Sequence, residues 1–419
     1  MTFFYEGVSF FDTAVLIFFL LFVWSLIYRN PAFMIIAIMF VNVALSAMSF
    51  YLIELGGYIT ELGNWSYRTG NLPLHVFYNT LFVSSFFLAY RASGVSNGHL
   101  GCQRSQNRLF SLANRLIVFL LVAVIATEYI SLFFYGVAIV DGINKVDYAI
   151  INPVVGFFGS TATYVSVFLG GLYFHSYKKF YLGIYLAHFL FLILSAQKFS
   201  ALIVNLSFFF SLYLIRKQYF RMSGKLLYGI ILLSITILAV FYFAYSQSNS
   251  FSDELGLSVS GAMAYRALYL SAHAQWASLI VFFQSGGELI GLVDLVEFNK
   301  YIVTLLHPQD TFDSLEKGVT FGMVFPAYYI LGVPVILHIP LVLFQGGLIG
   351  LMLSIFTKWM SSGKLIGACI LSVFLNILIR IFITGDLSQF FSFQSIFVYF
   401  SLVMYVLIRW ALASGRVVD

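Results

Sequence analysis

Two basic and two aromatic side chains recur at helical spacing within residues 258–285. Arg266 and His273 are seven residues apart. Tyr269 and Trp276 continue the stripe at three-residue steps, so on one helix all four would share a face. A guanidinium offers pyrophosphate oxygens a fixed fork of donors, and an imidazole can take a proton from a hydroxyl near neutral pH. The pattern predicts a face that binds a phosphate and a sugar; the alternative is an interfacial helix with a snorkelling arginine and anchoring aromatics.

Further cations stand at the ends of apolar runs. Lys198 occupies a sharp turn between two runs, and Arg380 lies a few residues inside the end of another. Each is a candidate ligand for a lipid-linked phosphate, because a charge held at membrane depth is a functional candidate by default. Snorkelling to phospholipid headgroups is the alternative for Lys198. For Arg380 the alternatives are a shared site or a structural salt bridge with Asp386 on the following turn.

A third cation, Arg68, closes the short segment 63–68 after Trp65 and Tyr67. The two aromatic rings could stack on sugars beside the guanidinium. Tryptophan and tyrosine in such loops also serve as anchors at the membrane interface, so both interpretations stay open.

Glu128 lies in the middle of an apolar run, where an unpaired carboxylate needs a partner or a proton. His188 is a second ionisable residue at membrane depth. Glu128 is the best hint of a transporter, but a proton pathway usually needs further buried acidic partners, and only His188 and Lys198 are candidates. A structural, hydrogen-bonded Glu128 fits equally well. His307, Asp310 and Asp313 are external acid–base candidates of lower rank.

Several other chemistries lack their motifs. The sequence contains no GxxxxGK[ST], HExxH or CxxC pattern, and its carboxylates recur at no DxD-like spacing. We therefore predict neither a required metal nor a cofactor.

The elements that must position these residues follow from composition. Of the 419 residues 61% are hydrophobic and 9% charged, against about 25% charged in soluble domains, and the mean hydropathy is +0.94. Apolar stretches of about 20 residues match the hydrocarbon thickness of a bilayer, where the backbone must be helical. We predict an all-α polytopic transmembrane bundle of about eleven spans in one domain, 1–419. The expected spans are 9–28, 31–55, 71–90, 116–140, 151–174, 180–196, 199–215, 226–246, 327–357, 365–384 and 392–409, with 327–357 the least regular.

Basic residues fix the expected orientation, because they are retained on the cytoplasmic side. An external N-terminus and a cytoplasmic C-terminus assign most of the 22 Lys and Arg residues to the cytoplasm and nearly every carboxylate to the outside. The net charge of +5 is then a topological signal, and nucleic-acid binding is not expected. Segment 247–326 becomes a large external loop that contains helices, one of them ended by Gly286–Gly287. Cys102 and Cys369 are expected to lie too far apart for a disulfide.

Together these features resemble the Wzy-type O-antigen and oligosaccharide repeat-unit polymerases, which are related to the GT-C class of membrane glycosyltransferases. The resemblance rests on the many spans, one dominant late external loop, the basic residue in the turn 194–201 and the Arg266/His273 segment. The stretch 318–332, continued to Gly346, Gly347 and Gly350, resembles the family's re-entry into the membrane. The expected eleven spans and external N-terminus depart from the family's more numerous spans and internal N-terminus.

The resemblance implies lipopolysaccharide biosynthesis at the periplasmic face of the bacterial inner membrane. The growing glycan would pass from undecaprenyl pyrophosphate to a new lipid-linked repeat unit, with membrane lipid and a chain-length regulator protein as further candidate partners. Arg266, Arg380 and Lys198 would stabilise charge on the leaving pyrophosphate. His273, or else Asp386, would act as base, and Arg68, Tyr269 and Trp276 would contact the glycan.

Two other functions remain open. A flippase or exporter of the same lipid-linked sugars would use Glu128 and the outer cations, but the two halves of the chain show no convincing repeat. An O-antigen ligase would use a similar donor and differ in its acceptor.

Overall fold

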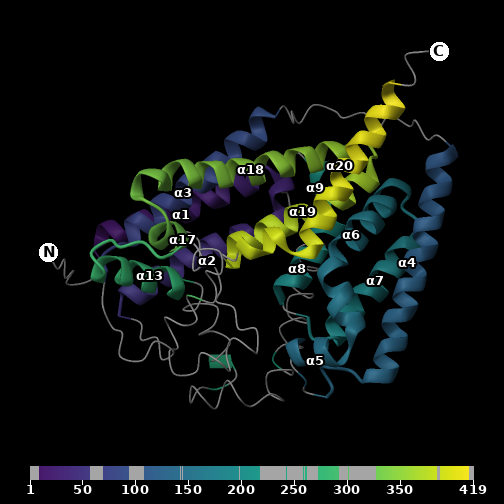
Figure 1. Cartoon of the computed structure of the whole chain (residues 1–419), viewed down its shortest axis with the longest axis horizontal. Coiled ribbons are helices and arrows are strands. Elements are labelled where there is room, and N and C mark those ends of the chain that lie inside the picture. Colours follow the sequence, from purple (N-terminus) through teal and green to yellow (C-terminus); the bar gives the residue numbers. More distant parts are fainter. Residues whose placement is uncertain are drawn as a thin grey trace.

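The computed structural model describes residues 9–56, 69–93, 108–141, 143, 145–197, 199–217, 242, 258, 260, 261, 272–291, 301, 327–384 and 387–414. Every regular element within these residues is a helix (Figure 1), so the all-α prediction is confirmed for them. In chain order they are α1 (Phe10–Arg29), η1 (Pro31–Ile36), α2 (Ala37–Glu54), α3 (Leu72–Ala92), α4 (Arg108–Tyr135), α5 (Lys145–Ile151), α6 (Pro153–Ser176), α7 (Lys179–Leu194), α8 (Phe199–Phe209), α9 (Ser211–Ile215), α13 (His273–Gln284), α17 (Ala327–Gly332), α18 (Val335–Ser361), α19 (Leu365–Thr384), η3 (Leu387–Phe391) and α20 (Phe393–Ser414).

Six of the described helical stretches are long and apolar enough to cross a membrane. They are Phe10–Arg29, Pro31–Glu54, Leu72–Ala92, Arg115–Tyr135, Val335–Ser361 and Leu365–Ile383. The prediction of a polytopic membrane protein is therefore confirmed in this coarser form. Every other predicted span except 226–246 also contains a described helix. That span, apart from Tyr242, and most of the predicted loop 247–326 lie outside the described residues, so the count of about eleven stays a prediction.

The predicted span 327–357 is in fact two helices. α17 ends at Gly332 and α18 starts after Pro334, which occupies its N-cap position. Proline has no amide hydrogen to donate, so a helix start accommodates it without losing a hydrogen bond. A second proline, Pro340, lies inside α18 itself. The glycines assigned to a membrane re-entry, Gly346, Gly347 and Gly350, lie inside α18.

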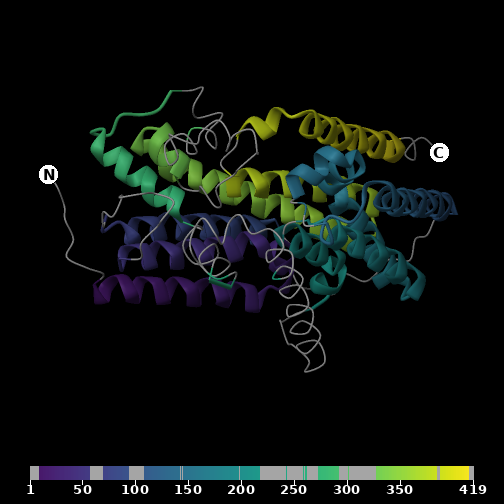
Figure 2. The same cartoon turned by 90° about the horizontal axis from the view of Figure 1, so that it is seen from below.

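Two of these glycines let α18 pack against α3. A Cβ atom at Gly346 would overlap the Phe82 carbonyl, and one at Gly350 would overlap the Phe86 carbonyl. Small residues four apart bring helix backbones into direct contact, which is a common device in membrane bundles. On the other side, α18 packs on α19, and α19 packs on α6 and α20. Figure 2 shows α1 and α20 on opposite faces of this arrangement.

One end of the bundle gathers basic residues. There Lys358 of α18 donates to the Ser93 carbonyl after α3. Arg216 at the end of α9 donates to the Phe174 carbonyl in α6 at 2.8 Å. We call this the basic end; its described cations are Arg29, Arg91, Arg115, Lys178, Lys179, Arg216, Lys217, Lys358 and Lys364. The opposite end, with α13, α17 and the turn from α2 to α3, we call the α13 end (Figure 1).

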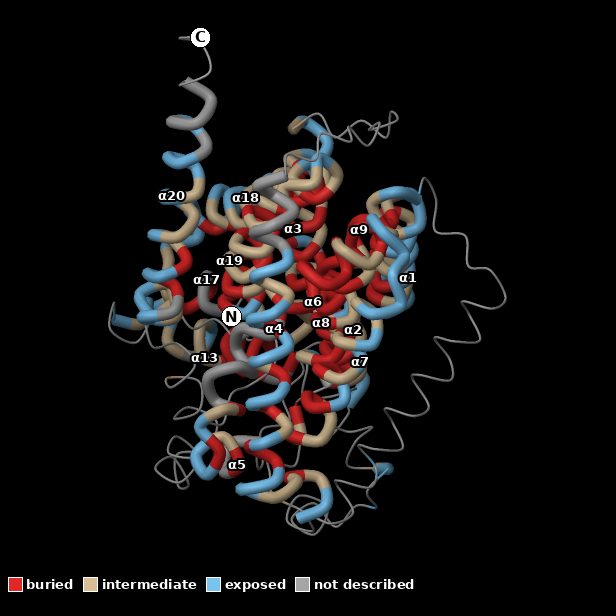
Figure 3. Tube along the Cα trace, turned by 90° about the vertical axis from the view of Figure 1, so that its right-hand side faces the viewer, coloured by how far each residue is buried: buried red, intermediate tan, exposed pale blue. Residues whose placement is uncertain are grey.

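The core lies among α2, α3, α6, α8 and α9, where most of the chain is buried (Figure 3). Aromatic rings fill much of it. Phe33 of η1 packs edge-on against Phe86 and Tyr90, and Phe82 stacks on Phe382 of α19 at 4.4 Å between centroids. By contrast, α1, α4 and α20 expose large apolar side chains, as expected of helices that face lipid.

Candidate functional site

α13 is the described helix of the predicted external loop, and it begins at His273. Ala272, its N-cap, has φ −126° and ψ 1°, which is not helical geometry. The expected helix over 258–285 is therefore not continuous at Ala272. The segment before it, which includes Arg266, lies outside the described residues, so the shared face of Arg266 and His273 stays a prediction. The predicted end is confirmed: Gly286 and Gly287 have φ of 70° and 89°, and their amides donate to Phe283 and Phe282.

α13 packs on α17 and on α2. The amide of Ala272 donates to Ser49 Oγ of α2 at 3.2 Å, which anchors the start of α13 on the bundle. Trp276 follows one turn later and is only 2% exposed. Its Nε1 has no hydrogen-bond partner among the described residues. The Trp276 ring is thus buried, and its indole N–H has no partner in the part of the chain that the structure describes. Its predicted contact with the glycan stays a prediction.

A buried polar cluster lies on α2 and α3 next to this contact. His75 of α3 lies 2.8 Å from Ser46 Oγ and 3.0 Å from Asn79 Nδ2, both measured from Nε2. Its ring stacks on Phe50 of α2 with centroids 4.9 Å apart. Ser46 and Ser49 are three residues apart on α2 and so share a face. The contact under α13 and the His75 cluster thus line the same side of α2.

The hydrogen bonds define the state of the His75 ring. Asn79 Nδ2 can only donate, so Nε2 accepts and the neutral ring carries its proton on Nδ1. Neither His75 Nδ1 nor Asn79 Oδ1 has a hydrogen-bond partner among the described residues, and both side chains are buried. Unpaired buried polar atoms are rare in native proteins and need an explanation. His75 Nδ1 can therefore donate, and Asn79 Oδ1 can accept, a hydrogen bond with a hydroxyl or an amide.

The turn between α2 and α3 closes this end. The Glu54 carboxylate accepts hydrogen bonds from the Thr69 amide at 2.9 Å and the Gly70 amide at 3.0 Å, and from the Thr69 hydroxyl. Glu54 is buried, and these bonds satisfy its charge. Arg68, the predicted glycan ligand, immediately precedes Thr69 and lies outside the described residues.

A second unusual feature is the turn between α7 and α8. Ala196 adopts φ 53°, a left-handed conformation that is uncommon for a residue other than glycine. The next residue, Gln197, is 2% exposed, and neither atom of its side-chain amide has a hydrogen-bond partner in the described structure. Backbone strain and unpaired buried groups both concentrate at functional sites. Lys198 comes next and lies outside the described residues.

The third feature is an ionisable pair inside the bundle. Nδ1 of His188 on α7 lies 3.0 Å from both carboxylate oxygens of Glu128 on α4, and both side chains are at most 1% exposed. The hydroxyl of the neighbouring Tyr129 donates to the Ala187 carbonyl at 2.9 Å, so the two helices are fastened at this level. Glu128 thus has the partner that its depth requires.

The structure describes only part of the predicted site. Arg266, Tyr269, Arg68, Lys198 and Asp386 lie outside the described residues, as does the side chain of His273. Arg380 is described and exposed, near the end of α19. Within the described ranges no group of three or more His, Cys, Asp or Glu residues could hold a metal ion.

Several buried polar residues were missed by sequence reasoning. His75 and Asn79 lie inside the predicted span 71–90, and Gln197 directly precedes Lys198 in the turn between two predicted spans. His338 of α18 is also buried, with Tyr78 Oη at 2.7 Å from Nδ1 and the Val333 carbonyl at 2.8 Å from Nε2. A histidine inside an apolar span was a usable signal for His75 and His338.

The fold and its apolar spans define a multi-pass α-helical membrane protein. A family model described as "Family of unknown function (DUF6418)" matches residues 300–413, the part that includes α17 to α20. No curated protein and no solved structure matches the chain.

Proposed function

We propose that this protein is a membrane glycosyltransferase that polymerises lipid-linked oligosaccharide repeat units, as O-antigen polymerases do. The observation that carries the proposal is a set of buried atoms at the α13 end that have no hydrogen-bond partner among the described residues: His75 Nδ1, Asn79 Oδ1 and Trp276 Nε1. A saccharide carries many hydroxyls that can donate and accept, so it is a ligand that such groups fit. The resemblance of the chain to this polymerase family supports the same function.

The proposed reaction transfers the growing glycan from undecaprenyl pyrophosphate to the terminal sugar of a new lipid-linked unit. As the bond to pyrophosphate breaks, negative charge builds on the leaving group, and Arg266, Lys198 and Arg380 would stabilise it. His273 would take the proton from the attacking hydroxyl, with Asp386 as the second candidate. The protein would follow a GT-C-like architecture with about eleven spans.

Sugar contacts complete the proposed site. Arg68 and Tyr269 would contact the glycan, and Trp276 would do so through its indole N–H, because its ring is buried. A chain-length regulator is the proposed protein partner.

In this proposal the basic end faces the cytoplasm of the bacterial inner membrane and the α13 end faces the periplasm. The support is the gathering of the described lysines and arginines at one end, since insertion retains positive charge on the cytoplasmic side.

Glu128 and His188 favour a second candidate, a proton-coupled flippase of the same lipid-linked sugars. An ionisable pair at membrane depth is a common element of proton pathways. Nε2 of His188 has no hydrogen-bond partner within the described ranges, which leaves one edge of the ring for a further proton step.

The proposal is tested by deleting the gene and complementing the deletion strain with the wild-type gene or with Arg266→Ala. The measurement is the glycan ladder on lipopolysaccharide in each strain. We expect a single repeat unit on the lipid core in the deletion strain, a restored ladder with wild type, and no restoration with Arg266→Ala. Complete absence of surface glycan in the deletion strain would favour the flippase or a ligase. A normal ladder with Arg266→Ala would contradict the role of Arg266.

A further inference from the structure

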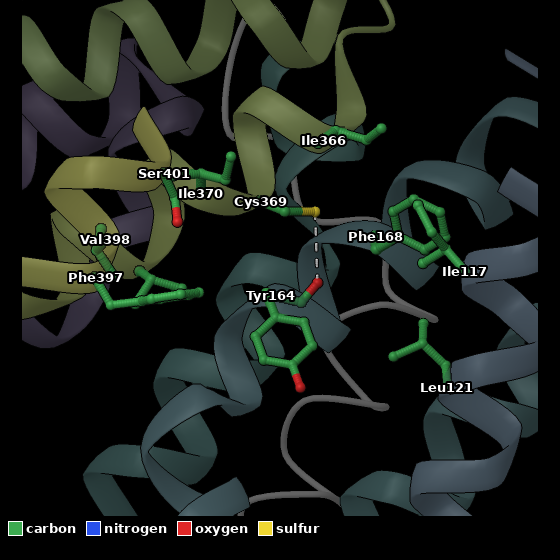
Figure 4. Close-up of a pocket in the computed structure, with 11 residues that line it drawn as sticks. Ile117, Leu121, Tyr164, Phe168, Ile366, Cys369, Ile370, Phe397, Val398 and Ser401 are labelled. Atoms are coloured by element: carbon green, nitrogen blue, oxygen red, sulfur yellow. Dashed lines mark hydrogen bonds between the residues drawn. The ribbon is translucent and has the colours of Figure 1, made fainter. Parts of the chain in front are cut away.

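A pocket of about 280 Å³ opens among α4, α6, α19 and α20, away from the unpaired polar groups described above. Figure 4 shows Ile366, Cys369 and Ile370 of α19 facing Tyr164 and Phe168 of α6. Ile117 and Leu121 of α4 line one side, and Phe397, Val398 and Ser401 of α20 line the other. The lining is almost wholly apolar, and the Cys369 thiol within it is engaged with the Tyr164 carbonyl.

The pocket adjoins surfaces that face lipid. α4 packs mainly on α6 and α7, and α20 packs mainly on α19 and η3, so the pocket lies between these two groups of helices. Beside it, Phe119 and Leu120 of α4 are 69% and 54% exposed, and Phe397 and Phe400 of α20 are 62% and 63% exposed. In a helix that spans a membrane, such side chains contact hydrocarbon. A hydrocarbon chain can therefore enter without crossing a polar surface.

Cations stand at the end of the pocket that lies toward the basic end. Lys364 directly precedes α19, two residues before the lining residue Ile366. The exposed Arg115 precedes the lining residue Ile117 by two residues on α4. Trp359 and Tyr405 pack together at the same end, with ring centroids 5.4 Å apart. Paired aromatic and basic residues are typical of the level of lipid headgroups.

We propose that this pocket binds one acyl chain of an anionic phospholipid whose phosphate lies near Arg115 and Lys364. The apolar lining takes the hydrocarbon chain, and the two cations take the negative charge. A phospholipid is preferred over a second protein copy because the lining offers a protein backbone almost no polar partner. Cations at one end and an apolar pocket behind them match the charged headgroup and the apolar acyl chain of a lipid. The lipid would join α4 to α20.

The test uses the full-length protein in nanodiscs that contain phosphatidylglycerol with a diazirine in its acyl chain. After irradiation, we expect the peptides with Leu121, Phe168 and Ile370 to carry more label than those with Phe133 and Phe344, which are exposed elsewhere. Matched phosphatidylcholine should label the pocket less. Equal labelling of all exposed apolar positions, or equal labelling by the two lipids, would overturn the proposal.

Variants sharpen the result. Leu121→Trp and Ile370→Trp fill the pocket, and each should reduce its labelling by about tenfold, because each displaced methylene contributes roughly fourfold in affinity. Leu120→Trp, on the exposed face beside Leu121, is the matched control and should leave the labelling unchanged. An equal loss with Leu120→Trp, or capture of another segment or copy of the chain in the pocket, would contradict a bound lipid.

The charge contribution is tested by Arg115→Gln combined with Lys364→Gln. The preference for phosphatidylglycerol over phosphatidylcholine should disappear, while the labelled positions stay the same. Arg91→Gln combined with Lys217→Gln removes two other exposed cations of the basic end and should keep the preference. A preference that survives the first pair would overturn the assigned phosphate position.

Discussion

His188 and Glu128 pair inside the helix bundle, with Nδ1 of the imidazole 3.0 Å from both carboxylate oxygens. The pair joins α4 to α7 within a region that excludes water from both side chains. A hydrogen-bonded pair of this kind fastens two helices, and it can also hold a proton in transit. The two roles make different predictions.

We expect Glu128→Gln to support normal glycan assembly, because glutamine can still accept a hydrogen bond from His188 Nδ1 but cannot take up a proton. Glu128→Leu leaves the imidazole unpaired and should lower the unfolding free energy by about 1–2 kcal/mol. Thermal unfolding in detergent measures the stability and the lipopolysaccharide ladder measures the function. Loss of surface glycan with a stably folded Glu128→Gln protein would indicate proton coupling and a transporter.

Trp276→Phe tests the indole N–H at the α13 end. The substitution keeps most of the buried ring and removes an N–H without a partner among the described residues. We expect the KM for the lipid-linked acceptor to rise by about tenfold, the value of one hydrogen bond, with little change in stability. Trp359→Phe, at the basic end, is the matched control and should leave KM unchanged. An unchanged KM for both variants would remove Trp276 from the site.

Gln197→Leu tests whether the buried amide in the turn between α7 and α8 acts in the reaction or only affects stability. Leucine relieves a buried amide that has no partner in the described structure, so the unfolding free energy should rise by about 1 kcal/mol or more. If the amide contacts the substrate, polymerisation should fall at the same time. Ser211→Ala, which removes another buried hydroxyl without a described partner, is the control and should keep full activity. A more stable and fully active Gln197→Leu protein would show that the amide has no role in the reaction.

Gly350→Ala tests the contact between α3 and α18. The added methyl group would overlap the Phe86 carbonyl, so the helices must separate, and overpacking of this kind costs about 1–3 kcal/mol. Gly347 lies three residues earlier, and a Cβ there meets only Ala89 at 3.9 Å. Gly347→Ala should therefore leave stability unchanged or raise it by up to about 1 kcal/mol through helix propensity. Equal melting temperatures for the two variants would contradict the close packing.

Most helices could be predicted from the sequence, because an apolar run of sufficient length has few alternatives in a membrane. α1, α3 and α19 begin within two residues of the predicted spans. Caps add local definition: Ser9 and Asp12 form a capping box at the start of α1. The division of 327–357 falls at Pro334, but Pro340 lies inside α18, so proline alone does not locate the break in the sequence.

The start of α13 could not be predicted in the same way. No proline or glycine marks Ala272, and although Ser271 directly precedes it, α13 has no side-chain cap, so the helical pattern continues through this position in the sequence. The observed contact there is tertiary, because the Ala272 amide donates to Ser49 on a helix more than 200 residues away. The predicted stripe crosses Ala272, and because Arg266 and Tyr269 lie outside the described residues, the stripe itself stays a prediction.

The contacts between spans could not be predicted from the sequence either. Glu128 and His188 were both recognised as ionisable residues at membrane depth, but their contact depends on α4 and α7 being neighbours. The His75 cluster depends in the same way on α2, α3 and α13. An apolar span has no strongly polar face to indicate which side meets another helix, so the sequence carries little information on neighbours.

The most direct test of the central proposal is a reaction with the purified full-length protein in proteoliposomes that contain undecaprenyl-pyrophosphate-linked repeat units. We predict that lipid-linked glycans longer than one unit appear, that free undecaprenyl pyrophosphate is released, and that Arg266→Ala abolishes both. Transfer of unchanged single units across the bilayer, with no lengthening by the wild-type protein, would contradict a polymerase and identify a transporter of the same lipid.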